Sequence, residues 1–134
     1  MTARDGRIAG GEASRPGEPL LASTSFVRTQ DTPWEAAGPG VRRQILGYGP
    51  DLMMVRIEFE AGAIGALHHH PHRQVTYVAT GSFQVTVDGV RQLLGAGDSF
   101  FVAADLVHGV EAVAAGTLVD VFTPARRDFL HAGG

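Results

Sequence analysis

Four histidines lie within five positions of the segment LHHHPHRQVTYV, residues 67–78. The chain has six histidines in all and no cysteine, so a metal site here would have to do without thiolate ligands. Residues two apart in an extended strand share a face, so His68 and His70 point the same way and His69 points the other. Gln74 follows four residues after His70, close enough to return to the same place after a turn.

Two interpretations of this histidine segment remain open on its residues alone. Convergent neutral imidazoles are common ligands of divalent transition metals. A solvated polar strand edge would have the same composition. The position of the segment, between two strand patterns in mid-chain, argues against the remnant of a purification tag.

The flanking glycines extend the segment to a longer pattern. With Gly62 and Gly81 it becomes G-x5-H-x-H-x3-Q-x6-G, and Gly97 is followed eleven residues later by His108. These two patterns, in this order and at this separation, resemble the two motifs of the cupin superfamily. That resemblance implies one divalent metal ion per chain, with the ligands His68, His70, Gln74 and His108.

The sequence departs from the usual cupin motifs at four positions. Ala103, Asp105 and Ala112 replace a proline, a glycine and an asparagine at turn or packing positions, and none of these changes removes a ligand. Gln74 stands where most cupins have Glu. A dication held by neutral donors alone keeps its full charge, which makes it a stronger Lewis acid and a stronger attractor of anionic oxygen. Zinc, nickel, manganese and iron all remain open, because spacing does not select among them.

The C-terminal segment LVDVFTPARRDFL, residues 118–130, narrows the resemblance. It contains the pattern D-x-F-x-P-x-R-x-D-F-L, and the chain from Trp34 to Leu130 is similar to small cupins of the KdgF type. These proteins open unsaturated uronate rings in pectin and alginate degradation, and Gln is their expected first-motif ligand. The resemblance implies an anionic sugar substrate, a 4,5-unsaturated monouronate, and its conversion to the linear 4-deoxy-5-keto form.

Three residues of this segment are the candidate catalytic group: Asp120, Phe122 and Arg126. Leu118, Asp120 and Phe122 alternate on one face of an apolar strand, where a carboxylate is unfavourable unless it is paired or functional. Asp120 would move the proton and Arg126 would orient the substrate carboxylate, while Phe122 would line the pocket. The competing interpretations are an Asp–Arg pair that serves structure, a core phenylalanine and a surface arginine.

The elements that must position these residues are strands. Apolar and polar residues alternate over 55–60 and 83–87 with the period of a half-buried strand, and VDGV at 87–90 predicts a type I′ hairpin. Glycine contributes 18 of 134 residues, which fits many tight turns. We expect an all-β fold of roughly nine or ten short strands, the double-stranded β-helix or jelly-roll barrel of cupins, with its site at the mouth.

The strand patterns also predict the boundaries of the elements. Separate short strands are expected over 74–81 and 82–89, and again over 108–116 and 117–124, where apolar stretches alternate with turns. LLASTSFVR at 20–28 could form a first strand, residues 31–40 a loop, and PARRDFLHA at 124–132 the one helix. Residues 1–19 are expected to be poorly ordered, and residues 20–134 to form a single cupin domain.

Composition restricts the class of protein. The net charge of −3 argues against a nucleic-acid or membrane surface, and no run approaches the ~18 apolar residues of a membrane span. The N-terminus has no apolar signal segment, so a cytoplasmic protein is expected. Small cupins commonly pair, which implies a homodimer. The alternatives to uronate ring opening are a polyketide cyclase, a metal-dependent dioxygenase and a non-catalytic module that binds a small ligand.

Overall fold

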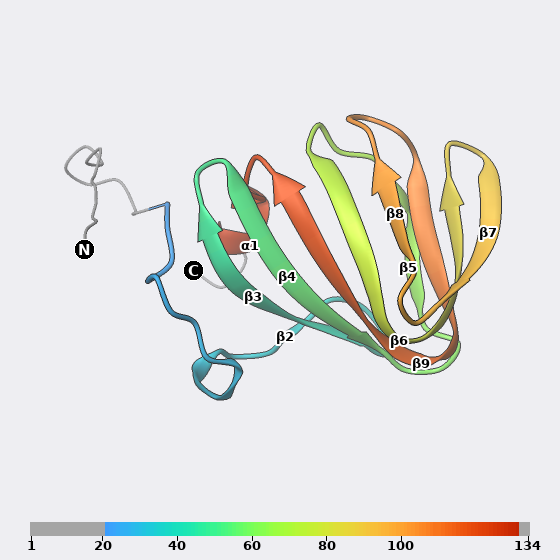
Figure 1. Ribbon diagram of the computed structural model, residues 1–134, viewed down its shortest axis with the longest axis horizontal. Coiled ribbons are helices and arrows are strands. Elements are labelled where there is room, and N and C mark those ends of the chain that lie inside the picture. Colours follow the sequence, from blue (N-terminus) through green and yellow to red (C-terminus); the bar gives the residue numbers. More distant parts are fainter. Residues whose placement is uncertain (1–20, 132–134) are drawn as a thin grey trace.

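Eight strands, one 3-10 helix and one α-helix form the part of the chain that the structure, a computed structural model, describes: residues 21–131 (Figure 1). In chain order the elements are η1 (Thr29–Asp31), β2 (Glu35–Ala36), β3 (Val41–Gly49), β4 (Leu52–Phe59), β5 (Ile64–His68), β6 (Arg73–Val87), β7 (Val90–Gly95), β8 (Ser99–Val102), β9 (His108–Thr123) and α1 (Arg127–His131). Residues 1–19, expected to be poorly ordered, lie outside the described residues, so the boundary at residue 20 stays a prediction. No helix within 21–131 is long and apolar enough to cross a membrane.

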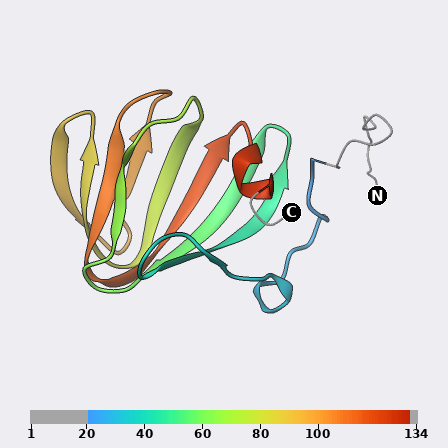
Figure 2. The same cartoon turned by 180° about the vertical axis from the view of Figure 1, so that it is seen from behind.

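The strands form one antiparallel sheet that bends into a jelly-roll barrel. Its order is β2-β3-β4-β9-β6-β7, with β5 paired to β9 and β8 paired to β6. Strands β6 and β9 pair along almost their whole length, from Arg73 opposite Thr123 to Val87 opposite His108. Strand β8 lies in front of β5 in Figure 1 and behind it in Figure 2, which shows the molecule from the back. The sheet therefore curls round on itself. The expected all-β jelly-roll barrel is confirmed.

Strand β9 bends sharply, and this brings both of its ends to one place. His108 begins the strand and Phe122 lies near its end, yet their rings lie 4.8 and 5.8 Å from the ring of His70. A straight strand of this length would hold them roughly 45 Å apart, at about 3.3 Å per residue. The bend therefore joins two parts of the sequence that were recognised separately.

Two glycines allow this bend. The φ of Gly81 is +86°, and a Cβ there would lie 2.6 Å from the Ala115 carbonyl oxygen. A Cβ on Gly116 would likewise collide with the carbonyl oxygen of Thr80. The register between β6 and β9 shifts in this region, between Val78 and Phe83. The expected division into separate strands at 81/82 and 116/117 is wrong, because these glycines admit a close backbone approach and the strands continue through them.

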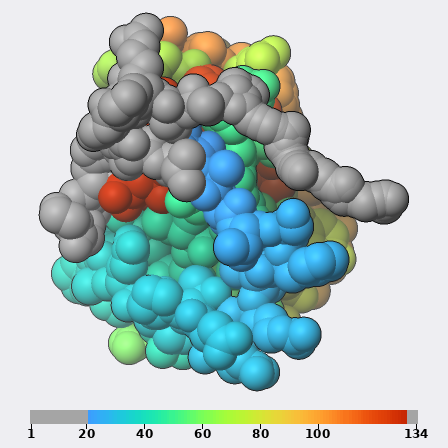
Figure 3. Space-filling view, turned by 90° about the vertical axis from the view of Figure 1, so that its left-hand side faces the viewer, coloured from blue at the N-terminus to red at the C-terminus, as the bar shows by residue number. Residues whose placement is uncertain are grey.

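Other expected elements have mixed outcomes. The hairpin at 87–90 is confirmed, with positive φ at Asp88 and Gly89, and the short C-terminal helix is confirmed as α1. The first strand expected over 20–28 is absent from 21–28, where only Ser23 bonds to the end of β3, at Tyr48. Figure 3 shows this segment, coloured blue, on the face turned toward the viewer. Strand β2 lies within the expected loop over 31–40.

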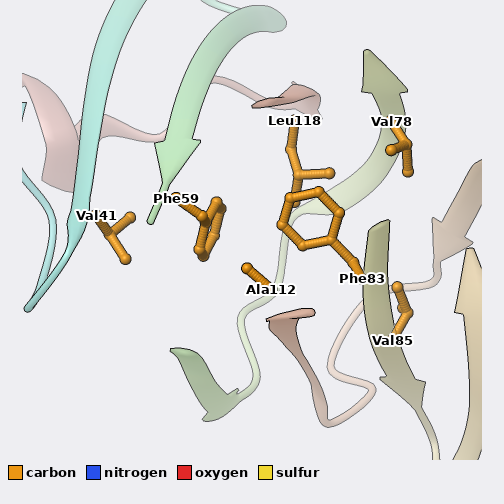
Figure 4. Close-up of a cluster of buried hydrophobic side chains, with 7 residues drawn as sticks. All are labelled: Val41, Phe59, Val78, Phe83, Val85, Ala112 and Leu118. Carbon is orange, nitrogen blue, oxygen red and sulfur yellow. The ribbon is translucent and has the colours of Figure 1, made fainter. Parts of the chain in front are cut away.

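The apolar side chains form two clusters. The larger fills the barrel, with Phe59 and Phe83 in edge-to-face contact at 5.3 Å, and Figure 4 shows its buried members, Val41, Phe59, Val78, Phe83, Val85, Ala112 and Leu118. The smaller cluster, Met53, Val55, Phe122 and Ala125, packs against Phe129 and Leu130 of α1. Burial of these groups supplies most of the stability of such a domain, at about 25 cal/mol per Å² of apolar surface removed from water.

Candidate metal centre and active site

Three of the predicted ligands converge. Strand pairing sets His68, the last residue of β5, opposite His108, the first residue of β9. Their ring centres lie 4.3 Å apart, and His70 lies 4.8 Å from His108. One nitrogen from each of the three rings lies within 4.8 Å of the others, with His70 and His108 buried and His68 exposed. The arrangement can hold a metal ion, as the motif resemblance implied.

Backbone carbonyls orient the three rings. The Nδ1 atoms of His68, His70 and His108 lie 2.7, 3.0 and 2.9 Å from the carbonyl oxygens of Ala66, His72 and Leu106. Because a carbonyl can only accept, each Nδ1 carries the proton and each Nε2 presents a lone pair. This tautomer leaves Nε2 of each ring able to bind a metal.

Burial keeps two of these rings neutral. It lowers the pKa of His108 to about 4, and it also lowers the pKa of His70, with a further contribution from the positive charge of Arg126. Imidazole binds a metal only when it is neutral, so this environment favours ligation at neutral pH. The buried Nε2 of His108 has no hydrogen-bond partner among the described residues, although an unpaired buried polar atom is unfavourable. A bound cation would satisfy it.

The side-chain amide of Gln74 lies beside the histidine cluster. Its Oε1 lies 3.1 Å from His70 Nε2, while its amide nitrogen donates to Thr76 Oγ1 at 2.8 Å and faces Asp120 Oδ1 at 3.4 Å. The donated hydrogens fix the amide orientation, so Oε1 and the His70 Nε2 present two lone pairs to each other. A cation between them would turn this unfavourable contact into ligation. The residues present therefore fit a divalent metal.

Asp120 lies inside the barrel, beside this donor set, and is only 5% exposed. It faces Thr76 across β6 and β9, and the Thr76 hydroxyl donates to its Oδ1 at 2.6 Å. Burial raises the pKa of Asp120 to about 6, against the lowering effects of the Thr76 hydrogen bond, the Arg126 charge and the Gln74 amide. No salt bridge joins Asp120 to an arginine within the described residues, so the Asp–Arg pair considered from sequence is not formed there.

Phe122 and Arg126 both line the cavity. Phe122 is buried, and its ring meets those of His70 and Phe129 edge-on at 5.8 Å in each case. The Arg126 side chain is only 12% exposed, and Asp128 accepts two hydrogen bonds from it, at 3.0 and 2.7 Å. Arg126 is therefore not a free surface charge. Phe122 belongs to both the core and the pocket wall, so its two interpretations are compatible.

The two additional histidines differ from each other. His69 is exposed, as strand alternation predicts. His72 is half-buried against Phe122, with ring centres 6.4 Å apart, and its pKa is lowered first by burial and then by Arg126. It is therefore a packed side chain beside the site.

A cavity of about 340 Å³ opens onto His68, His108 and Asp120. This is near the lower end of the ~300–1,000 Å³ typical of small-molecule pockets. Its wall includes the predicted residues His68, Gln74, His108, Asp120, Phe122 and Arg126. Arg43 and Phe129 are among the wall residues that the sequence did not predict as part of the site. The first carried a signal, because strand alternation in VRRQIL sets Arg43 on the same face as Val41 and Ile45.

An antiparallel jelly-roll barrel with three convergent histidines and a neighbouring amide defines the class of protein as a cupin whose histidine cluster could hold a metal. Comparison with known families agrees, because the family profile described as "Cupin domain" matches residues 55–122. The chain belongs to the cupin family.

Similar proteins place it more narrowly. The "Pectin degradation protein KdgF" of Dickeya dadantii (strain 3937) is 44% identical over 102 residues, covering 75% of this chain and 93% of that protein. The solved structure of KdgF from Halomonas sp. is 35% identical, with a TM-score of 0.76 over 80% of this chain and 99% of that one. An RmlC-like cupin from Shewanella frigidimarina NCIMB 400 is 46% identical, with a TM-score of 0.80 over 82% and 99%. The expected similarity to KdgF-type cupins is confirmed.

Proposed function

We propose that this protein is a metal-dependent enzyme of pectin or alginate breakdown that converts 4,5-unsaturated monouronates to linear 4-deoxy-5-keto uronates. The observation that carries the proposal is the position of the buried Asp120 carboxyl, which shares a cavity with the histidine cluster and Arg126. The similarity to two KdgF proteins, one of them named for pectin degradation, supports the same substrate class.

The metal would be held by His68, His70, Gln74 and His108. When bound, it would supply a Lewis acid of undiminished positive charge that attracts and polarises substrate oxygens. The donor chemistry suits zinc, nickel, manganese or iron. One ion per chain is expected, and elemental analysis of protein purified without chelator tests the stoichiometry.

Asp120 would move the proton. The ring enol ether must gain a proton at C4 and water at C5, after which the hemiketal opens to the ketone. A protonated Asp120 can deliver the first proton, and the resulting carboxylate can accept one from the attacking water. With a pKa of about 6 it is close to the working pH, where a group that both gives and takes a proton is most effective.

Arg126 and Phe122 would hold the substrate. Asp128 accepts hydrogen bonds from Nε and Nη2 of Arg126, which fixes the guanidinium and leaves its remaining hydrogens for a substrate carboxylate. Phe122 would exclude water from one side of the ring and fix its position relative to Asp120. Orientation of this kind makes the added proton and water arrive at defined carbons.

Loss of ultraviolet absorbance tests this function. An unsaturated monouronate absorbs through its conjugated enol-ether carboxylate, and the linear keto product lacks that chromophore. Metal-loaded protein is expected to accelerate the loss above the spontaneous rate for the pectin-derived or the alginate-derived sugar. The absence of acceleration with both would contradict the proposal. Oxygen consumption would instead support a dioxygenase, and tight binding without turnover a binding module.

Two further properties belong to the proposal. We propose a homodimer, on the resemblance to small cupins that pair, and a cytoplasmic location. Light scattering coupled to size exclusion tests the oligomeric state, and fractionation of cells that express the untagged chain tests the location.

A further inference from the structure

Arg43 is an arginine on the inner face of the barrel. Strand register sets it opposite Ile57 of β4, and Ile57 is in turn opposite Leu118 of β9. All three residues line the cavity beside the histidine cluster. The Arg43 side chain is only 17% exposed. A cation in so apolar a row is unfavourable unless it is paired or has a function.

Two contacts hold the Arg43 guanidinium in place. Its Nε donates to Glu35 Oε1 of β2 at 3.1 Å, and its central carbon lies 3.8 Å from the centre of the Phe129 ring. The Arg126 guanidinium lies 4.1 Å from the centre of that same ring. The two guanidinium carbons are therefore no farther apart than the sum of those distances. Two cations are fixed on one aromatic ring at the wall of one cavity, although like charges repel each other.

The pairing of Arg43 leaves donors available. A guanidinium carries five N–H groups, and Glu35 accepts from the Nε group alone. Within residues 21–130 no oxygen accepts a hydrogen bond from the two terminal nitrogens of Arg43. By contrast, Arg126 has its Nε and one terminal nitrogen committed to Asp128. Counting partners among residues 21–130 alone, Arg43 has the larger share of donors free for a ligand.

We propose that Arg43 is a substrate-binding residue, which donates hydrogen bonds to the hydroxyl oxygens of the uronate at the end remote from its carboxylate. The inference rests on the proposed function, in which Arg126 holds that carboxylate. A uronate has oxygens at both ends, and a pocket with two rigid cations matches it better than it matches a molecule with one polar end. Arg43 contributes to binding and orientation, and it takes no part in proton transfer.

Arg42 offers a matched control on the same strand. It too is paired to a glutamate, Glu58 at 2.7 Å, and it too stacks on an aromatic ring, Trp34 at 3.9 Å. It faces outward, however, with its side chain 54% exposed, and it is not part of the cavity wall. Loss of an ion pair and a stacked contact is common to both changes. Loss of a substrate contact is expected only at Arg43.

The experiment compares Arg43→Gln with Arg42→Gln in the metal-loaded full chain, using unsaturated galacturonate. We expect Arg43→Gln to raise KM by about tenfold or more, the usual scale for a hydrogen bond that involves a charged group, with kcat changed by less than about threefold. Arg42→Gln should leave KM within about twofold of the unchanged protein, since exposed pairs contribute little. Equal changes in KM in the two variants would overturn the proposal.

Two further measurements cover the other outcomes. Should Arg43→Gln fail to fold, Arg43→Lys keeps the charge but not the planar fork, and an unchanged KM in that variant would overturn the proposal. Should the unchanged protein not turn over unsaturated uronates, the proposed function fails, and calorimetry with saturated galacturonate then tests Arg43 separately. Binding that weakens at Arg43→Gln but not at Arg42→Gln supports the role. Equal binding in both variants, or no binding by the unchanged protein, contradicts it.

Discussion

Replacing Asp120 by asparagine is expected to raise stability and lower activity. Asparagine has the shape of aspartate and can still accept a hydrogen bond from the Thr76 hydroxyl. In the unchanged protein that hydroxyl lies 2.6 Å from Asp120 Oδ1. It cannot titrate. A positioned acid or base typically contributes ~10²–10⁴ in rate, so we expect kcat to fall at least about tenfold. Fold and metal content should be retained.

The gain in stability follows from the raised pKa of Asp120. That pKa lies at about 6, above its ordinary 3.8, because burial disfavours the charged form. The unfolded chain therefore releases the proton at a lower pH than the folded chain. Folded stability falls as pH rises from about 4 to 6, and above that range the loss is about 3 kcal/mol, at 1.36 kcal/mol per pKa unit. A bound dication would reduce this cost, because it attracts the carboxylate.

The assay measures turnover and urea unfolding at about pH 7.5 and at about pH 4. The unchanged protein and Asp120→Asn should differ in the free energy of unfolding by about 1–3 kcal/mol in favour of the variant at the higher pH, and by less at the lower. A folded, metal-loaded and fully active variant would refute the catalytic role. A variant that is less stable at the higher pH would instead indicate a structural role for Asp120.

Three further changes have defined outcomes. Gln74→Glu should tighten metal binding in a competition titration and lower kcat, because a carboxylate partly neutralises the ion and raises the pKa of the nearby Asp120; unchanged kcat would contradict this. His108→Ala should reduce metal content well below one equivalent in elemental analysis, while circular dichroism stays that of a β protein; full occupancy would exclude His108 as a ligand. Gly81→Ala should destabilise the fold by about 2 kcal/mol or more, because its φ is positive and the new Cβ would meet the Ala115 carbonyl; an unchanged unfolding midpoint would disprove the packing argument.

The sequence was most informative where several residues form one pattern. The spacing of His68, His70, Gln74 and His108 matched known motifs, and the fold brings these residues together. Asp120 was identified because a carboxylate interrupted an otherwise apolar strand face. Both arguments depend only on the types and spacing of residues along the chain, which the sequence itself contains.

The boundaries of the long strands could not be predicted in the same way. Gly81 and Gly116 have the composition of turn residues, and only the close contact between β6 and β9 shows that they serve a bend. That contact joins residues more than thirty positions apart, so no local pattern contains it. Asp105 shows the converse, since it stands where the cupin motif usually has glycine and adopts a positive φ (66°), a conformation that glycine favours.

Arg43 was missed because its partners come from distant parts of the chain. Alternation in its strand indicated an inward-facing cation, but the same residues also fit a solvated strand edge. The ring of Phe129 and the carboxylate of Glu35 reach it only through the docking of α1 and β2 against β3. Long-range packing, and not local propensity, therefore determines this part of the pocket.

The dependence of turnover on metal occupancy tests the central claim most directly. Protein stripped with chelator would be titrated with a single divalent metal, while the loss of ultraviolet absorbance from an unsaturated monouronate is followed at each step. The account predicts that the rate rises in proportion to occupancy and levels off at one ion per chain, while His108→Ala stays at the spontaneous rate throughout. Full activity in the stripped protein, or no activity at full occupancy, would contradict it.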